Sequence, residues 1–160
     1  YTMALCMVDL GLRSIEVVRL RLSDIDWPHK ILSVPATKTG RGRQLPLPLH
    51  LAKALRAYIS KRPATHCDRL FVGHHFGRGQ PVSTGAVRAA MGAAYRRCGF
   101  PQDWCGTHRL RHTFATRLFA RGGDLKHIAD LLGHHSISTT NLYAQVDLKS
   151  LRALAQPWPA

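Results

Sequence analysis

The chain has 160 residues, of which 45% are hydrophobic and 20% charged, and its 23 Lys and Arg against 9 Asp and Glu give a formal net charge of +14. The length is that of a single domain, and the composition excludes a disordered chain. No apolar run reaches the roughly 18 residues that a membrane span requires, and no signal peptide opens the chain.

The excess of positive charge is typical of a protein that binds a polyanion, and nucleic acid is the commonest one. The basic residues are scattered along the whole chain and form no basic amphipathic helix, so an anionic membrane surface is the weaker alternative, beside a merely soluble basic protein. The four cysteines form no C-x-x-C pair. They are interpreted as reduced thiols, which predicts a cytoplasmic protein.

Hydrophobic periodicity predicts a mainly α fold with a small antiparallel β-sheet, in the α+β class. Helices are expected over residues 2–10, 14–22, 50–61, 84–97, 108–121, 125–132, 138–145 and 147–155. The first should end at Gly11 and the third before Pro63, while Ser83, Thr107 and Asp124 are suitable N-caps for later helices.

The period changes between the second and third helices. Short strands are predicted over Ile31–Val34 and 44–47, on either side of a basic turn at 38–42 that contains Gly40 and Gly42. This part of the sequence indicates a small hairpin or sheet.

A phosphate site is indicated at the start of the helix predicted after Thr107. His108 and Arg111 are three residues apart, so they face the same side of a helix. Both lie in its first turn, where N–H groups and the helix dipole favour an anion.

Two alternatives compete for this region. His108 and His112 have the spacing of a zinc-binding helix, but Arg109 stands where H-E-x-x-H requires a glutamate, and no cysteine pair completes a site. Residues 124–146 also fit a helix-turn-helix with small residues at Ala129 and Gly133. From this stretch alone, the phosphate site and the helix-turn-helix are equally supported.

Four segments together resemble one family, the tyrosine recombinases or phage integrases. In chain order they are GLRSIEVVRLRLSDID, similar to the first arginine box; TKTGRGRQLPLP, similar to the β-turn lysine segment; HRLRHTFAT, similar to the H-x-x-R box; and LLGHHSISTTNLY, similar to the segment that carries the tyrosine. They extend over residues 11–143 and therefore cover nearly all of the chain.

The resemblance implies a role for each matched residue. Tyr143 would attack a DNA phosphodiester and form a 3′-phosphotyrosyl bond. Arg13 and Arg111 would hold the non-bridging oxygens with planar guanidinium groups, and His134 would add a hydrogen bond. Lys38 would protonate the departing 5′-oxygen.

Further residues have supporting roles under the same resemblance. His108 would help to remove the tyrosine proton, and Glu16 would orient its neighbours. Arg41, Arg43 and Arg109 are expected to contact DNA. No metal, ATP or other cofactor is expected, because arginines supply the charge stabilisation and the phosphotyrosyl bond conserves the energy of the broken one.

The resemblance further implies that residues 1–160 form the catalytic domain of such a recombinase, without the N-terminal DNA-clamping domain that the family carries. The implied partner is double-stranded DNA, on which the full-length protein would form a homotetramer. Two other functions compete with site-specific recombination. One is DNA relaxation of the type IB topoisomerase kind, and the other is non-catalytic DNA binding through a helix-turn-helix.

Overall fold

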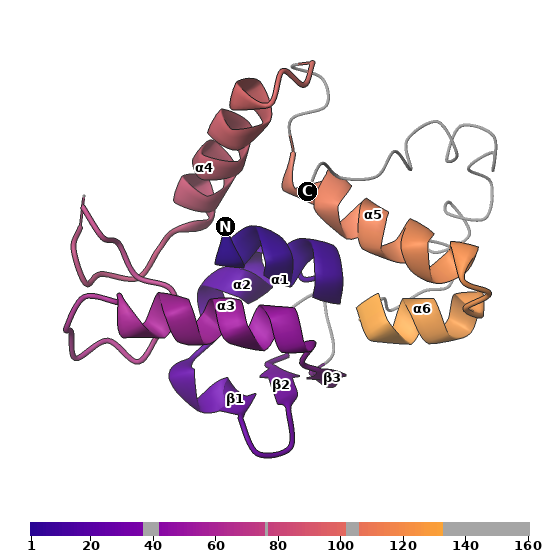
Figure 1. Cartoon of the computed structure of the whole chain (residues 1–160), viewed down its shortest axis with the longest axis horizontal. Coiled ribbons are helices and arrows are strands. Elements are labelled where there is room, and N and C mark those ends of the chain that lie inside the picture. The colour runs from indigo at the N-terminus through magenta and orange to yellow at the C-terminus, as the bar shows by residue number, and fades with distance from the viewer. Residues whose placement is uncertain (37–41, 76, 102–105, 133–160) are drawn as a thin grey trace.

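The computed structural model describes residues 1–36, 42–75, 77–101 and 106–132 (Figure 1). This part of the chain is mainly helical with a small antiparallel sheet, which is the predicted class. The helices are α1 (Thr2–Leu10), α2 (Ser14–Arg19), α3 (Leu49–Ser60), α4 (Thr84–Arg97), α5 (Thr107–Ala120) and α6 (Leu125–Leu132). Among these helices, none has the length and apolar character needed to cross a membrane.

The sheet has three antiparallel strands in the order β1-β2-β3. They are β1 (Ile25–Asp26), β2 (Ile31–Val34) and β3 (Arg43–Pro46), and a 3-10 helix, η1 (Leu22–Asp24), precedes them. Leu32 pairs with Ile25 on one side and with Leu45 on the other, and all three side chains are buried. The strand predicted at 44–47 begins one residue earlier, while β1 is too short for its sequence to have indicated it.

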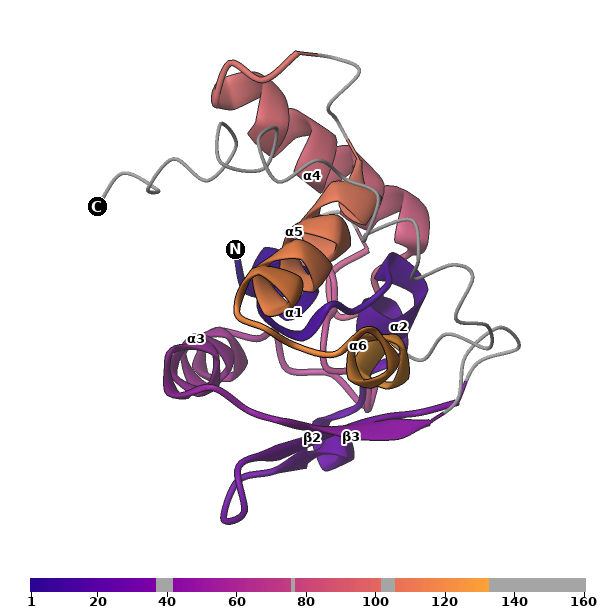
Figure 2. The same cartoon turned by 90° about the vertical axis from the view of Figure 1, so that its right-hand side faces the viewer.

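The helices lie on one side of the sheet, and α1 runs through the middle of them (Figures 1 and 2). The core on this side includes Met7 of α1 and Leu51 and Leu55 of α3, each with 0% exposure. Burying one such side chain stabilises a fold by about 1.5–3 kcal/mol relative to leaving it in water. These contacts fix α1, and with it the turn that follows, against the rest of the domain.

The second predicted helix is shorter than expected, because α2 ends at Arg19 instead of residue 22. Leu20 has an extended backbone, and its carbonyl accepts a hydrogen bond of 2.8 Å from the N–H of Leu70. The N–H of Leu22 likewise donates to the carbonyl of Asp68 at 3.0 Å. Backbone pairing with a distant segment therefore replaces the last helical turn, although the apolar spacing would have allowed that turn to form.

The capping predictions have different outcomes. Ser83 caps α4, since its Oγ accepts the N–H of Ala86 at 3.1 Å, and Oδ2 of Asp124 accepts the N–H of Lys126 at the start of α6. The expectation for Thr107 is wrong, because the extended Gly106 is the N-cap and Thr107 is the first residue of α5. The helices predicted over 138–145 and 147–155 lie outside the described residues.

Candidate active site

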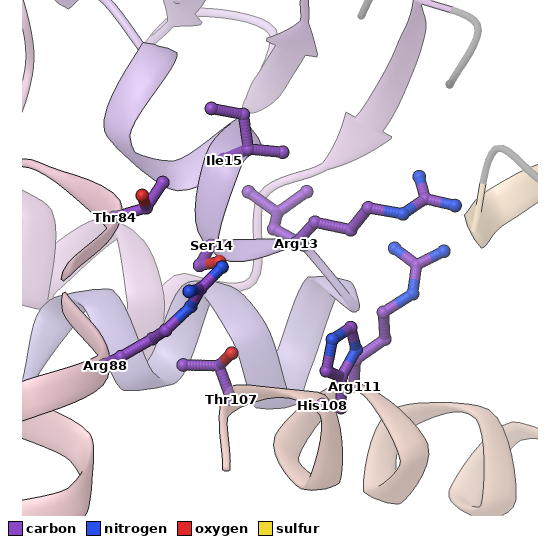
Figure 3. A pocket seen from close by; sticks show the side chains of 9 residues that line it. Arg13, Ser14, Ile15, Thr84, Arg88, Thr107, His108 and Arg111 are labelled. Carbon is purple, nitrogen blue, oxygen red and sulfur yellow. The ribbon is translucent and has the colours of Figure 1, made fainter. Parts of the chain in front are cut away.

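Three separate parts of the chain line a cleft of about 350 Å³. They are the turn from α1 into α2, the first half of α4 and the first turns of α5 (Figure 3). The lining residues are Leu12, Arg13, Ser14, Ile15, Thr84, Arg88, Thr107, His108 and Arg111. The cleft therefore brings Arg13 together with His108 and Arg111, which lie almost 100 positions further along the sequence.

Arg13 is held at the start of α2 by Glu16. The backbone N–H of Arg13 donates to Oε2 of Glu16 at 2.8 Å, which satisfies an N–H that a helix start would otherwise leave without a partner. Its Nη1 donates to Oε1 of the same carboxylate at 3.1 Å and to the carbonyl of Leu132 at 3.4 Å. The side chain is 21% exposed, so it still reaches solvent at the cleft.

Arg111 lies one helical turn after His108 on α5 and is almost completely buried. Its Nη1 donates to the carbonyl of Gly11 at 2.5 Å, and its Nη2 donates to the carbonyl of Leu132 at 2.6 Å. A buried charge is costly unless it is well bonded, and these backbone oxygens provide such bonds. Arg13 and Arg111 share the Leu132 carbonyl, so their guanidinium groups lie side by side (Figure 3).

Glu16 is the acidic centre of this arrangement and is only 1% exposed. Its carboxylate accepts two hydrogen bonds from Arg43, at 3.0 and 3.1 Å, and lies 3.8 Å from Nη1 of Arg111. Burial tends to raise the pKa of Glu16, but the bonds and charge of Arg43, the N–H of Arg13 and the charge of Arg111 outweigh it and lower the pKa. The carboxylate is therefore ionised at neutral pH.

The histidines of α5 lie in cationic surroundings. Burial first, and then the charges of His108, Arg109 and Arg111, lower the pKa of His112. Surroundings that disfavour an imidazolium also disfavour a metal cation. Within the described ranges, no group of three or more His, Cys, Asp or Glu is placed to hold a metal ion, so the paired histidines have no further ligand there.

The structure also adds residues that the sequence did not single out. Thr84 and Arg88 lie one helical turn apart on α4, and both line the cleft opposite Ser14 (Figure 3). Their spacing places them on one helix face, but nothing local in the sequence shows that this face lies against the start of α2. Only the folded chain brings a third arginine to the same cleft.

Two of the arginines expected to contact DNA lie within the described residues. Arg109 is exposed on α5, and Arg43 faces Glu16 from the start of β3, with 9% of its side chain exposed. The other predicted positions, namely Lys38, Arg41, His134 and Tyr143, lie outside the described residues.

Comparison with known proteins defines the class. The chain has the fold of a tyrosine recombinase catalytic domain: it superposes on the crystal structure of XerA recombinase with a TM-score of 0.83 and 29% identity, over 99% of this chain and 58% of that one. Residues 1–149 match the phage integrase family, and the chain belongs to that family.

Two curated relatives extend this comparison. A putative integrase/recombinase, y4rA, of Sinorhizobium fredii is 38% identical over 160 residues, which are 99% of this chain and 39% of the relative. The tyrosine recombinase XerA of Thermococcus kodakarensis is 32% identical over 148 residues, which are 92% of this chain and 51% of the relative. The chain thus spans about half or less of the length of these relatives.

Proposed function

We propose that the protein is a site-specific DNA recombinase that breaks and rejoins DNA through a 3′-phosphotyrosyl intermediate, without metal or ATP. The observation that carries the proposal is the paired guanidinium groups of Arg13 and Arg111 beside His108 in one cleft. Two planar cations held side by side match the non-bridging oxygens of a phosphodiester.

The proposed reaction needs one nucleophile and two proton transfers. The phenol oxygen of Tyr143 attacks the phosphorus, the bond to the 5′-oxygen breaks, and a 3′-phosphotyrosyl bond forms. His108 accepts the phenol proton and Lys38 donates a proton to the departing 5′-oxygen. Attack by another 5′-hydroxyl reverses these steps and joins a new strand.

The arginines act on the charge that develops on the phosphorus-bound oxygens. Arg13 and Arg111 are held by Glu16 and by backbone carbonyls, so they need little reorganisation when the pentavalent transition state forms. A guanidinium carries five N–H donors, so a group bonded to carbonyls can also bind phosphate oxygens. His134 adds a further hydrogen bond to the same oxygens.

The proposed partner is double-stranded DNA, bound by a homotetramer of the full-length protein. A net charge of +14 supports contact with the DNA backbone. Arg41 and Arg109 are proposed phosphate contacts, and Arg88 and Thr84 join them because they line the cleft beside Arg13.

The test uses a nicked suicide substrate and a denaturing gel that separates covalent protein–DNA adducts. The wild-type full-length protein should form an adduct, whereas Tyr143→Phe should bind DNA equally well and form none. A covalent adduct from Tyr143→Phe would exclude this tyrosine as the nucleophile. No adduct from the wild type would favour the non-catalytic DNA binder.

A second substrate tests the general acid. Lys38→Ala should lose cleavage of ordinary DNA but recover it when the leaving group is a 5′-phosphorothiolate, which leaves without a proton. Equal loss on both substrates would make Lys38 a phosphate-binding cation instead.

A further inference from the structure

Arg43 makes its contacts inside the protein, next to the paired arginines. Its Nη1 donates to Oε1 of Glu16 at 3.0 Å, and its Nη2 donates to Oε2 at 3.1 Å. The side chain is 9% exposed and Glu16 is 1% exposed, so this ion pair is largely shielded from water. A two-point bond of this kind fixes both the position and the plane of the carboxylate.

The same carboxylate contacts the two arginines proposed to hold the phosphate. Oε1 of Glu16 accepts from Nη1 of Arg13 at 3.1 Å, Oε2 accepts from the backbone N–H of Arg13 at 2.8 Å, and Nη1 of Arg111 lies 3.8 Å away. One carboxylate therefore lies among three guanidinium groups. Movement of the carboxylate would displace its hydrogen-bonded partner Arg13 and would change the electrostatic surroundings of Arg111.

We propose that Arg43 is a positioning residue of the cleavage site, which acts through Glu16 and not by contact with DNA. The proposal rests on the proposed recombinase function. Arg43 donates one hydrogen bond to each oxygen of the carboxylate and offsets its negative charge. Glu16 can then orient Arg13, and its weakened negative charge competes less with the DNA phosphate for the guanidinium groups of Arg13 and Arg111.

The place of Arg43 in the sheet adds a second consequence. Arg43 is the first residue of β3 and pairs with Val34, the last residue of β2. The segment between these two residues carries Lys38 in the sequence. The bond to Glu16 therefore connects the base of the lysine-bearing segment to the start of α2, where Arg13 lies.

The experiment compares Arg43→Gln, Glu16→Gln and the double variant in the full-length protein. The readouts are single-turnover cleavage of the suicide substrate, the Kd for DNA and the slope of log K against log salt. Arg43→Gln should slow cleavage roughly 10- to 100-fold, the scale of a misplaced catalytic group, while Kd and the salt slope stay close to wild type. In the Glu16→Gln background it should cost little more, because a neutral amide needs no charge partner.

Arg21→Gln is the matched control, because it removes an arginine from an ion pair with Asp68 that is exposed on both sides. It should leave the cleavage rate unchanged. Arg43→Lys keeps the charge but bonds the carboxylate at one point only. It should therefore cleave at a rate between wild type and Arg43→Gln, and it provides the test if the Gln variant does not fold.

Several results would overturn the proposal. A weaker Kd with a salt slope reduced by about 1 would make Arg43 a phosphate contact. Additive losses in the double variant would show that Arg43 does not act through Glu16, and wild-type cleavage by Arg43→Gln or by Arg43→Lys would refute the positioning role. These results differ from failure of the proposed function, in which the wild type itself forms no adduct.

Discussion

Replacing Gly11 by alanine should destabilise the domain by about 2–5 kcal/mol. Gly11 lies between α1 and α2 with φ +63°, in the left-handed region that side chains with a Cβ rarely adopt. A Cβ there would lie 2.5 Å from Cδ1 of Phe114 and 2.8 Å from Cδ2 of Leu132. The backbone strain accounts for about 1–2 kcal/mol, and the forced repacking for about 1–3 kcal/mol.

Gly99 provides a control that separates these two contributions. It has φ +73°, but no described atom lies within 4 Å of the place where its Cβ would be. Gly99→Ala should therefore cost only the backbone strain, about 1–2 kcal/mol. Urea unfolding followed by circular dichroism gives both free energies of unfolding under the same conditions.

Equal losses of stability in Gly11→Ala and Gly99→Ala would show that the contacts with Phe114 and Leu132 contribute nothing. Gly11→Ala should also impair DNA cleavage, in addition to its larger loss of stability. The carbonyls of Gly11 and Leu132 both accept from Arg111, so displacing them should slow DNA cleavage even at temperatures where the variant is folded.

Three other predictions follow from charge and burial. Because the pKa of Glu16 is lowered in the folded protein, its stabilising contribution should be complete above about pH 4.3 and be lost as pH falls through the lowered pKa. In urea unfolding across this range, the stability of Glu16→Gln should depend less on pH than that of the wild type, and an equal dependence would contradict the prediction. Burial raises the pKa of Cys6 to about 12, so a thiol reagent should modify the exposed Cys98 rapidly and Cys6 only on unfolding. Mass spectrometry measures the labelling of each cysteine, and rapid labelling of Cys6 would contradict this prediction. DNA affinity should fall steeply as salt rises in a binding titration, and salt-independent binding would remove nucleic acid as the partner.

The elements that local signals specify could be predicted from the sequence. Gly11 ends α1 as expected, Ser83 caps α4, and the strand over Ile31–Val34 has the predicted bounds. The end of α2 could not be predicted, because backbone groups of residues 68–70 determine where the helix stops. Thr107 fails as an N-cap for a local reason, since the extended Gly106 takes that position.

Some residues of the candidate site could likewise be predicted from the sequence, and others could not. His108 and Arg111 were expected from their spacing and from resemblance to the family, and Arg13 from the resemblance alone; the structure places all three at one cleft. The contribution of Arg88 depends on how α4 packs, which no local pattern encodes. The pairing of Arg43 with Glu16 joins residues 27 positions apart. From the sequence, Arg43 was expected to contact DNA together with Arg41 and Arg109, and no local pattern indicates its bond to a buried carboxylate.

The carbonyl of Leu132 affects how the protein tolerates mutation. It is a backbone oxygen, so no side-chain substitution at this position can delete the acceptor that Arg13 and Arg111 share. The Leu132 side chain is fully buried, so selection at this position acts on packing and volume. Sequence drift there should favour other apolar residues of similar volume, because these replacements keep the backbone, and with it the shared acceptor of both arginines, in place.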